Sequence, residues 1–269
     1  MKDHTSAVII KVKKDTWIAV QDEVIREVPL LIRINGSPCA TLMRTPGQEK
    51  ELALGFCFTE GILSDSWKEG GLQWEEPKKN CIGLLLDCSC LSRPVMSLMP
   101  FADSAENPAV EVAEDEEETV TRIFPSLSGR IESQLHISLL TLQNIENQSR
   151  HRQALFALTG ATHAACIFDR EGNYLFCFED MARHNALDKA IGHALLCGED
   201  LSDKILFLSG RTNCTLIRKA AKSRIPVVAS VSAPTSLAVS LSKKVGMTLI
   251  GFLRPGGMNI YAGQERIKT

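Results

Sequence analysis

The clearest pattern of apolar and polar positions in this chain lies between residues 159 and 189. Two runs rich in apolar and β-branched residues, 164–168 and 174–178, flank the five residues Asp169-Arg-Glu-Gly-Asn173. Such runs around a short loop that contains glycine are typical of a β-hairpin. The pattern therefore predicts two paired strands here.

A helix is predicted directly after this hairpin. Its apolar stripe consists of Ala186, Leu187, Ala190 and Ala194. Glu179 and Asp180 fall just before or in its first turn, where carboxylates suit the positive end of the helix dipole. Polar residues gather at the helix start, namely Arg183, His184, Asn185, Asp188 and Lys189. Because strand-to-helix loops often hold anionic or nucleotide-like ligands, this stretch is the first candidate site.

The front half of the chain contains a second hairpin pattern. Asn35-Gly36 is a strong two-residue turn between apolar-rich arms, and Pro38 predicts that the second arm lies at a sheet edge or bulge. A helix is expected over ELALGFCFTE, with Thr45-Pro46-Gly47-Gln48 as its capping sequence and Gly61 at its end.

The middle of the chain changes in composition. Residues 111–118 read EVAEDEEE, which predicts a solvated linker, with a docking surface for a basic partner as the alternative. Apolar residues at helical spacing then predict a connecting helix, namely Ile131, Leu135, Leu139, Leu142 and Ile145. We therefore expect two domains, a strand-rich front region over 1–125 and an α/β domain over 126–269.

Strands and helices alternate in the back half. Buried-strand patterns at 204–208, 227–231 and 247–252 are separated by helical patterns at 214–223 and 232–246. This alternation is typical of a sheet that is covered by helices. The predicted class is α/β, or α+β over the whole chain.

The charge of the chain excludes some functions. A net charge of -2 and a pI near 6.3 argue against a general binder of nucleic acids or membrane surfaces. No apolar stretch approaches the roughly 18 residues that span a bilayer, and the N-terminus lacks the apolar region of a signal peptide. We expect a cytoplasmic protein with neither nucleic acid nor membrane as a partner.

Nine cysteines are many for a cytosolic chain, and an odd number cannot all pair within it, so we expect reduced thiols. Four stand in apolar company and are predicted to pack as core residues: Cys57, Cys166, Cys177 and Cys197. Cys88 and Cys90 follow a predicted strand at 82–86 and would project to the same side of it. That pair could carry redox, sulfur or metal chemistry, with Cys81 as a third member, or be a chance proximity. No CxxC or histidine at ligand spacing supports zinc.

Several long motifs between Val28 and Tyr261 resemble the formate dehydrogenase accessory sulfurtransferase family. They are RINGSPCATLMRTPGQEKELALGFCFTEGIL, TGATHAACIFD, EDMARHNALDKAIGHALL, LSGR, SAPTSLAV and TLIGFLRPGGMNIY. The resemblance implies a back domain similar to the cytidine deaminase fold, with a mixed sheet and helices on its faces, and a cytoplasmic homodimer. Family members receive persulfide sulfur from a cysteine desulfurase. They pass it to the bis-guanine-dinucleotide molybdenum cofactor, molybdenum bis(molybdopterin guanine dinucleotide), before this enters formate dehydrogenase.

The chain departs from the family at the sulfur-carrying loop. The family has a CxxC there, in which one thiolate accepts sulfur and the second releases it by exchange. The corresponding segment, FPSLSGR from Phe124 to Arg130, contains no cysteine, and Ser126 and Ser128 cannot form persulfides. Ala161 and Ala182 also stand where the family usually has glycine.

Two functional interpretations follow. In the first, the protein is a sulfur carrier whose reactive thiol has moved to Cys88 or Cys90. In the second, it is a non-catalytic relative that binds the molybdenum cofactor, or delivers it, without carrying sulfur. A zinc deaminase is disfavoured because His163 is followed by Ala164-Ala165 and no Pro-Cys-x-x-Cys occurs, so no metal site is expected.

For the cofactor, the resemblance points to the FLRPGG motif, which comprises Phe252, Leu253, Arg254, Pro255, Gly256 and Gly257. A guanidinium group and exposed glycine amides suit phosphate oxygens. Further candidates are His163, Asp180, Arg183, His184 and Arg211. Simpler roles stay open for three of these. His163 could cap a turn or be buried, Asp180 could stabilise a helix dipole, and Arg183 could form a surface ion pair with Asp188.

Overall fold

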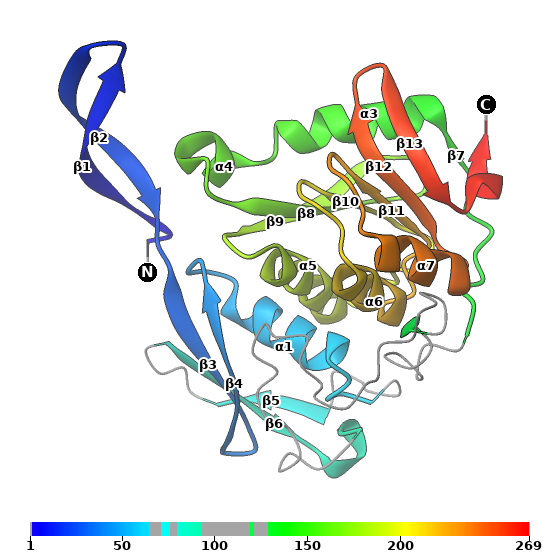
Figure 1. Ribbon diagram of the computed structural model, residues 1–269. Coiled ribbons are helices and arrows are strands. Elements are labelled where there is room, and N and C mark those ends of the chain that lie inside the picture. The colour runs from blue at the N-terminus through cyan, green and yellow to red at the C-terminus, as the bar shows by residue number, and fades with distance from the viewer. Residues whose placement is uncertain (1, 65–70, 76–79, 93–118, 121–128, 269) are drawn as a thin grey trace.

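The computed structural model of this chain describes residues 2–64, 71–75, 80–92, 119–120 and 129–268. In chain order it contains a projecting two-stranded arm, a front part built on a four-stranded sheet and a back part built on a six-stranded sheet (Figure 1). Helices pack against both sheets, so the predicted α/β class is confirmed. The predicted domain boundary at residue 125 and the acidic run 111–118 lie outside the described residues.

The arm is a β-hairpin that stands away from the rest of the molecule (Figure 1). Its strands, β1 (His4–Lys13) and β2 (Thr16–Ile25), are antiparallel and paired along their full length. Several of its apolar side chains are exposed, namely Val8, Ile10, Val12, Trp17, Ile18 and Val24. A lone two-stranded ribbon cannot bury such residues against itself, so the arm is an apolar surface that the rest of the chain leaves largely uncovered.

The front part is a sheet of strand order β4-β3-β6-β5 that packs against one helix. Its elements are β3 (Val28–Ile34), β4 (Ser37–Arg44), α1 (Glu49–Thr59), β5 (Leu72–Trp74) and β6 (Cys81–Leu86). The predicted hairpin turn at Asn35-Gly36 is confirmed. Pro38 lies on the edge strand β4 beside a register shift, as expected for a residue that lacks an N–H. Gly61 ends α1 with a positive φ of 67°, also as predicted.

The strand predicted at 82–86 is confirmed as part of β6, but Cys88–Cys90 form a 3-10 helix instead of continuing it. The prediction that Cys88 and Cys90 project to one side rests on the two-residue repeat of a strand, and the backbone does not continue as a strand there. The Cys90 side chain is buried, and its Sγ lies 3.9 Å from the carbonyl oxygen of Gly71.

The back part is a mixed sheet of strand order β13-β12-β11-β10-β8-β9. The central strands β10, β11 and β12 are parallel, whereas β8, β9 and β13 pair with their neighbours in antiparallel fashion. The strands are β8 (His163–Phe168), β9 (Tyr174–Asp180), β10 (Ile205–Leu208), β11 (Val227–Ser230), β12 (Thr248–Arg254) and β13 (Gly257–Ala262). The predicted β8–β9 hairpin is confirmed. The strand predicted to be last is followed by β13, and a short parallel pair, β7 (Ile137–Ser138) and β14 (Ile267–Lys268), lies outside the sheet.

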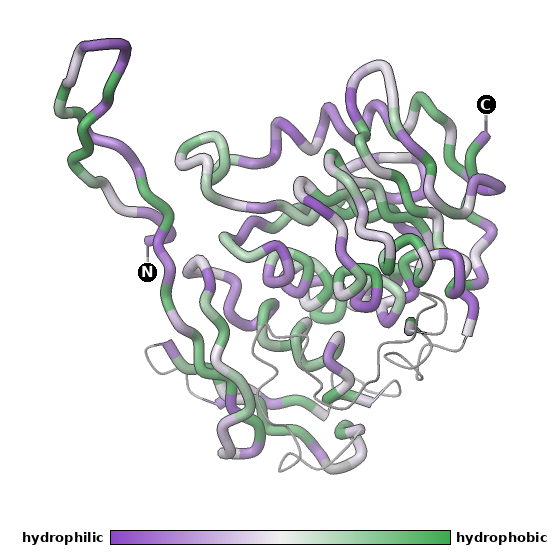
Figure 2. Tube along the Cα trace, in the orientation of Figure 1, coloured by the Kyte–Doolittle hydropathy of each residue, from purple (hydrophilic) through white to green (hydrophobic). Residues whose placement is uncertain are grey.

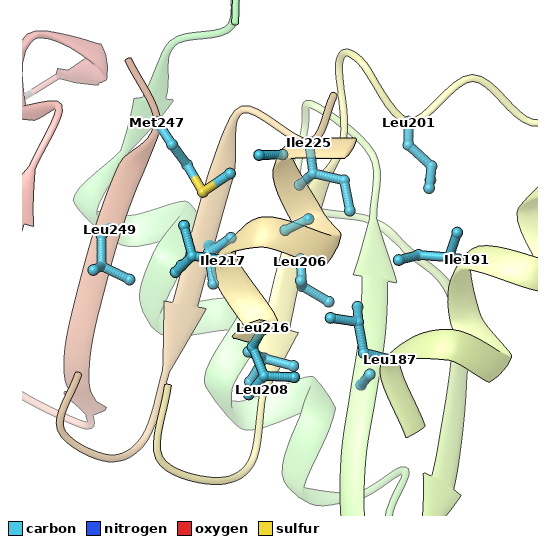
Figure 3. Close-up of a cluster of buried hydrophobic side chains, with 14 of the residues drawn as sticks. Leu187, Ile191, Leu201, Leu206, Leu208, Leu216, Ile217, Ile225, Met247 and Leu249 are labelled. Atoms are coloured by element: carbon cyan, nitrogen blue, oxygen red, sulfur yellow. The ribbon is translucent and has the colours of Figure 1, made fainter. Parts of the chain in front are cut away.

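Helices cover both faces of this sheet, as predicted. Three pack on one face: α5 (Arg183–Cys197), α6 (Cys214–Lys222) and α7 (Ser236–Lys244). Figure 3 shows apolar side chains of α5 and α6 facing those of β10 and β12. The other face packs against α3 (Leu139–Arg150). Figure 2 shows hydrophobic residues along the central strands. The closer likeness to the cytidine deaminase fold stays a prediction.

The helix predicted from Ile131 to Ile145 begins only at Leu139, after Ser138 accepts a hydrogen bond from the backbone N of Thr141. In the segment before Leu139, the backbone N of Ile131 donates a hydrogen bond to the carbonyl oxygen of Val245. Long-range contacts of the backbone therefore override the helical spacing of the apolar residues there.

The front and back parts meet where α1 crosses α5 in close backbone contact. A Cβ atom on Gly192 would lie 1.9 Å from the carbonyl oxygen of Glu51, and one on Gly55 would lie 1.9 Å from that of Asp188. Only glycine permits so close an approach of two helices. These two glycines therefore determine how the two parts fit together.

Buried charges also join the two parts. Asp188 is almost fully buried and its carboxylate lies 2.8 Å from Lys219 Nζ, so the predicted surface pair between Arg183 and Asp188 is wrong. Lys219 Nζ also lies 2.7 Å from Glu60, at the end of α1. The tertiary contact of three helices thus assigns Asp188 a partner that the sequence spacing does not indicate.

The predicted capping sequence of α1 forms a further link. Gln48, in a left-handed conformation, precedes the first helical residue, and its side chain makes no capping hydrogen bond. Thr45 instead accepts a hydrogen bond through Oγ1 from the backbone N of Met181, after β9. The prediction that Thr45 caps α1 is therefore wrong, because its hydroxyl serves a contact between the two parts.

The structure revises the assignment of the cysteines. Cys166 and Cys177 are register partners on β8 and β9 and form a disulfide, so the prediction of reduced core thiols is wrong for them. Cys57 is buried in the front core, as predicted. Cys197, predicted to be buried, is exposed, with Sγ 3.6 Å from Nε2 of His193. Within the described ranges no helix is long and apolar enough to cross a membrane.

Candidate functional site

Loops from five strands meet at one edge of the six-stranded sheet. Since β10, β11 and β12 are parallel, their carboxyl ends lie at the same edge, and they are followed by Ser209-Gly210-Arg211, 231–235 and the turn at Pro255-Gly256. β8 runs in the opposite direction, so its first residue, His163, lies at this edge beside Asp180, the last residue of β9. Open α/β sheets bind ligands at the carboxyl ends of their parallel strands.

A cavity of about 610 Å³ opens at this edge, between the strand ends and the C-terminal half of α3. Its titratable lining residues are Glu146, Arg150, His163 and Arg254. Its other lining residues include Gln153, Phe156, Thr162, Phe207, Ser209 and Val231. Two guanidinium groups line the cavity, and one of them, that of Arg150, is paired with the carboxylate of Glu146 at 2.5 Å. Together with the hydroxyl groups and aromatic rings, they suit an anionic ligand with a flat ring system.

His163 lines the cavity together with Arg150 and Arg254. Its ring is half-buried and packs on Gly210, where a Cβ atom would lie 2.9 Å from Nδ1. Burial lowers the pKa of His163, and the nearby positive charges of Arg183 and Arg211 lower it further. The imidazole is therefore neutral at pH 7 and can both donate and accept a hydrogen bond.

Arg254 belongs to the β12–β13 hairpin. Within the FLRPGG motif, Phe252 has a positive φ of 52° and donates its backbone N–H to Ser232, while Leu253 is buried in the core. The turn residue Gly256 has a φ of 88°. Of the six motif residues, only Arg254 lines the cavity, so the motif acts as a hairpin that presents one guanidinium group.

The remaining predicted residues take different positions. Arg211 is exposed, and the buried Nε of Arg183 has no hydrogen-bond partner in the described part of the chain. His184 Nε2 lies 3.4 Å from Nδ2 of Asn213, at the start of α6. None of these three lines the cavity itself.

Asp180 is fully buried and its carboxylate lies 2.8 Å from Lys189 Nζ. It also accepts hydrogen bonds from the backbone N atoms of Thr45 and Ala182 and from Nδ2 of Asn185. The side chain thus organises the loop before α5 and ties it to the front part. It does not line the cavity, and its contribution goes beyond that of a charge near a helix dipole.

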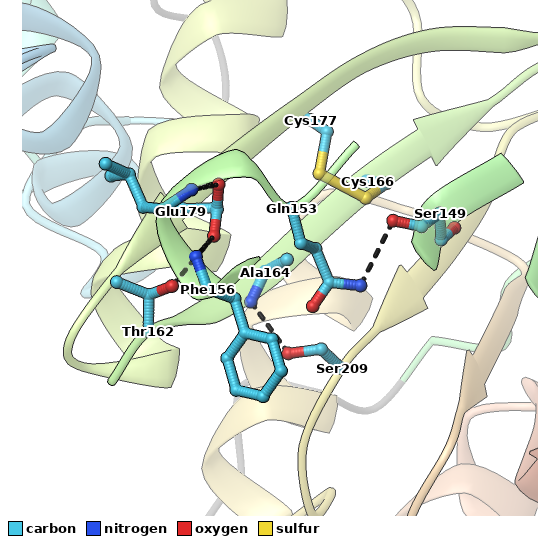
Figure 4. The surroundings of a disulfide bond; sticks show 10 residues. Ser149, Gln153, Phe156, Thr162, Ala164, Cys166, Cys177, Glu179 and Ser209 are labelled. Carbon is cyan, nitrogen blue, oxygen red and sulfur yellow. Dashed lines mark hydrogen bonds between the residues drawn. A yellow bond between two sulfur atoms is a disulfide. The ribbon is translucent and has the colours of Figure 1, made fainter. Parts of the chain in front are cut away.

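Glu179 positions one wall of the cavity, a role that the sequence pattern does not reveal. Its carboxylate accepts hydrogen bonds from the backbone N atoms of Leu155 (2.9 Å) and Phe156 (2.8 Å) and from Thr162 Oγ1 (2.7 Å), as Figure 4 shows. Glu179 therefore caps α4 (Ala154–Thr159) and not α5.

Arg150 and Gln153, near the end of α3, are also cavity residues that the sequence reasoning missed. Their helix was predicted only as a connector. The polar run ENQSRHRQ at residues 146–153 is the sequence feature that could have indicated these two cavity residues. Within the part of the chain that the structure describes, no group of three His, Cys, Asp or Glu residues could hold a metal ion.

The fold and this edge define a two-part mixed α/β protein with a basic cavity at the carboxyl ends of its parallel strands. The chain belongs to the FdhD/NarQ family, whose profile matches residues 25–268.

Named relatives match along nearly the whole chain. It is 35% identical to the sulfur carrier protein FdhD of Streptomyces avermitilis, over 96% of this chain and 94% of that protein. It is 33% identical to the sulfur carrier protein FdhD of Saccharolobus solfataricus, over 96% of each. A solved structure described as a formate dehydrogenase accessory protein from Desulfotalea psychrophila has the same fold, with a TM-score of 0.77 and 20% identity over 98% of this chain and 99% of that chain.

Proposed function

We propose that this protein assists formate dehydrogenase by binding the bis-guanine-dinucleotide molybdenum cofactor, as its substrate, and passing sulfur to it. Membership of the FdhD/NarQ family and the relatives named as sulfur carriers support this role. A cysteine desulfurase supplies the sulfur, the reaction takes place in the cytoplasm, and the protein acts as a homodimer. The binding step rests on one observation, the set of basic groups around His163.

The basic groups match the phosphates of such a substrate. Arg150 and Arg254 line the cavity together with His163, and Arg183 and Arg211 lie close enough to His163 to lower its pKa. Guanidinium groups bind phosphate oxygens through paired hydrogen bonds, and each guanine dinucleotide carries a pyrophosphate. The buried Nε of Arg183, which has no hydrogen-bond partner among the described residues, is a donor that a phosphate oxygen would satisfy.

The alternative function is delivery of the cofactor without sulfur transfer. The segment from Phe124 to Arg130 favours it, since this segment has no cysteine where the resemblance implies the family's sulfur-carrying pair. Its structure falls outside the described residues, apart from Gly129 and Arg130. Both functions require the cofactor to bind, so nucleotide binding is the first step to test.

Calorimetric titration with guanosine diphosphate tests this step. We expect binding to the wild-type protein, and a dissociation constant raised about tenfold or more in Arg254→Ala, because a lost charged hydrogen bond costs roughly 1.5–3 kcal/mol. Arg170→Ala is the matched control, because Arg170 is exposed in the loop at the other end of the β8–β9 hairpin. No binding at high micromolar nucleotide, or equal affinities of the two variants, contradicts the proposal.

A further inference from the structure

The disulfide between Cys166 and Cys177 lies directly behind the cavity wall. Cys166 pairs in register with Phe207, and both residues belong to the core on the α3 side of the sheet. Phe207 also lines the cavity. A small ion released from these sulfurs would therefore emerge next to the proposed substrate.

The two cysteines differ in accessibility. Cys166 is fully buried on β8, whereas Cys177 is half-buried on β9, which is the edge strand of the sheet. In thiol exchange, an outer thiol meets the incoming reagent and an inner thiol resolves the product. The pair has the asymmetry that such a division of roles requires.

Three of the other described thiols, Cys57, Cys197 and Cys214, fit sulfur transfer less well. Burial raises the pKa of Cys57 well above its usual range and that of Cys214 to about 12, so neither forms a thiolate readily. Cys197 is exposed beside His193, but it ends α5, whose first residue follows the end of β9 at the sheet edge that holds the cavity. A helix of this length places Cys197 about 20 Å from that edge. It also has no second thiol bonded to it.

We propose that Cys177 carries the sulfur and that Cys166 releases it. The inference rests on the proposed sulfur-transfer function, and it supplies the two thiols that the segment from Phe124 to Arg130 lacks.

The exchange proceeds in three balanced steps. In the reduced protein, the Cys177 thiolate attacks the outer sulfur of a persulfide donor, the donor thiolate leaves, and Cys177 becomes a persulfide. The Cys166 thiolate then attacks Sγ of Cys177, the bond to the outer sulfur breaks, and HS⁻ leaves. Two thiols have lost two electrons and the transferred sulfur has gained them. The product is the disulfide seen in the structure, and a dithiol reductant restores both thiols.

The test uses the whole protein, reduced without oxygen, freed of reductant and incubated with glutathione persulfide. We expect the wild type to release about one equivalent of sulfide per chain and to form the Cys166–Cys177 disulfide. In Cys166→Ala, sulfide release falls about tenfold or more and the peptide with Cys177 gains about 32 mass units, as a persulfide does. Cys177→Ser gives neither product. Cys197→Ser, the matched control, behaves like the wild type.

Two results overturn the inference. One is release of no more sulfide by the wild type than by Cys177→Ser, and the other is a mass gain on Cys197 in place of Cys177. Sulfide release and disulfide formation by the wild type are measured without Cys166→Ala, so this test stands even if that variant fails to fold. A chain that binds guanosine diphosphate but releases no sulfide contradicts this inference alone. One that releases sulfide through Cys177 but does not bind the nucleotide contradicts the cofactor proposal alone.

Discussion

At the scale of single residues, Gly192 shows how a missing side chain can determine the assembly of a molecule. Helix propensity disfavours glycine in the middle of a helix by about 1 kcal/mol relative to alanine. Gly192 nevertheless lies inside α5, because a Cβ atom there would meet the carbonyl oxygen of Glu51 at 1.9 Å. The crossing of α1 and α5 depends on that space.

We therefore expect Gly192→Ala to lower the free energy of unfolding by about 1–3 kcal/mol or more, as overpacking does. Urea denaturation of both proteins measures the difference. Gly129→Ala is the control, because a Cβ atom there meets nothing within 4 Å. A gain in stability in Gly192→Ala would show that helix propensity outweighs the close crossing.

At the scale of elements, the β1–β2 arm exposes apolar side chains that the rest of the described chain does not cover. Register pairing places Val12 and Trp17 on the same face of the ribbon, and Trp17 is 73% exposed. Exposed apolar residues in such a number are typical of an interface. The proposed homodimer would cover them.

We expect the wild-type protein to sediment as a dimer and Val12→Ser/Trp17→Ser to sediment as a monomer at micromolar concentration, since interface aromatic residues often contribute about 2 kcal/mol or more each. Sedimentation equilibrium is the measurement. Leu140→Ser, at an exposed apolar position on α3, is the control and should remain a dimer. A monomeric wild type, or a dimeric double variant, rules out the arm as the interface.

At the scale of the whole molecule, buried charges hold the front and back parts together. Glu60 lies 2.7 Å from both Arg218 and Lys219. Burial alone would raise the pKa of Glu60, but the charges of Lys219 and Arg218 hold it below its usual value. Since the folded pKa is the lower one, the ionised carboxylate stabilises the protein above the ordinary glutamate pKa of about 4.3. That stabilisation is lost as the pH falls through the folded pKa.

Glu60→Gln should therefore lower the free energy of unfolding by roughly 1.5–3 kcal/mol near pH 7, the range for hydrogen bonds to charged groups, and by progressively less below about pH 4. Urea denaturation of the wild type and of Glu60→Gln, near pH 7 and below about pH 4, measures this change. Glu171→Gln, which removes only an exposed pair with Arg170, should show no such pH dependence. An equal loss at both pH values would mean that Glu60 acts through packing and not through its charge.

Local patterns predicted the hairpins well and the contacts between distant segments poorly. The turn at Asn35-Gly36 and the hairpin around residues 169–173 are confirmed because neighbouring residues alone determine both. The cap at Thr45 and the surface pair of Asp188 failed, because Thr45 meets Met181 in the back part and Asp188 meets Lys219 on another helix. Both partners lie more than 30 positions away in sequence, and no local spacing of residues indicates them.

For the candidate site too, local motifs revealed some residues and tertiary packing alone revealed the others. His163 and Arg254 were predicted from motifs, and the structure brings both to one cavity. Arg150, Gln153 and Glu179 escaped the sequence reasoning, since only the packing of α3 and α4 against the sheet places them around that cavity. The cavity is formed by elements that are separate in the chain.

By itself, the sequence determined the class of fold, most strands and helices of the back part, and the motifs by which the chain resembles its family. The physical reason is that turn chemistry and the period of apolar residues act over a few neighbouring positions. Only the tertiary structure decided that Cys166 meets Cys177, that α1 touches α5 at two glycines, and that an uncovered arm projects from the body. These features depend on the register between strands and the packing of distant elements, which no local pattern encodes.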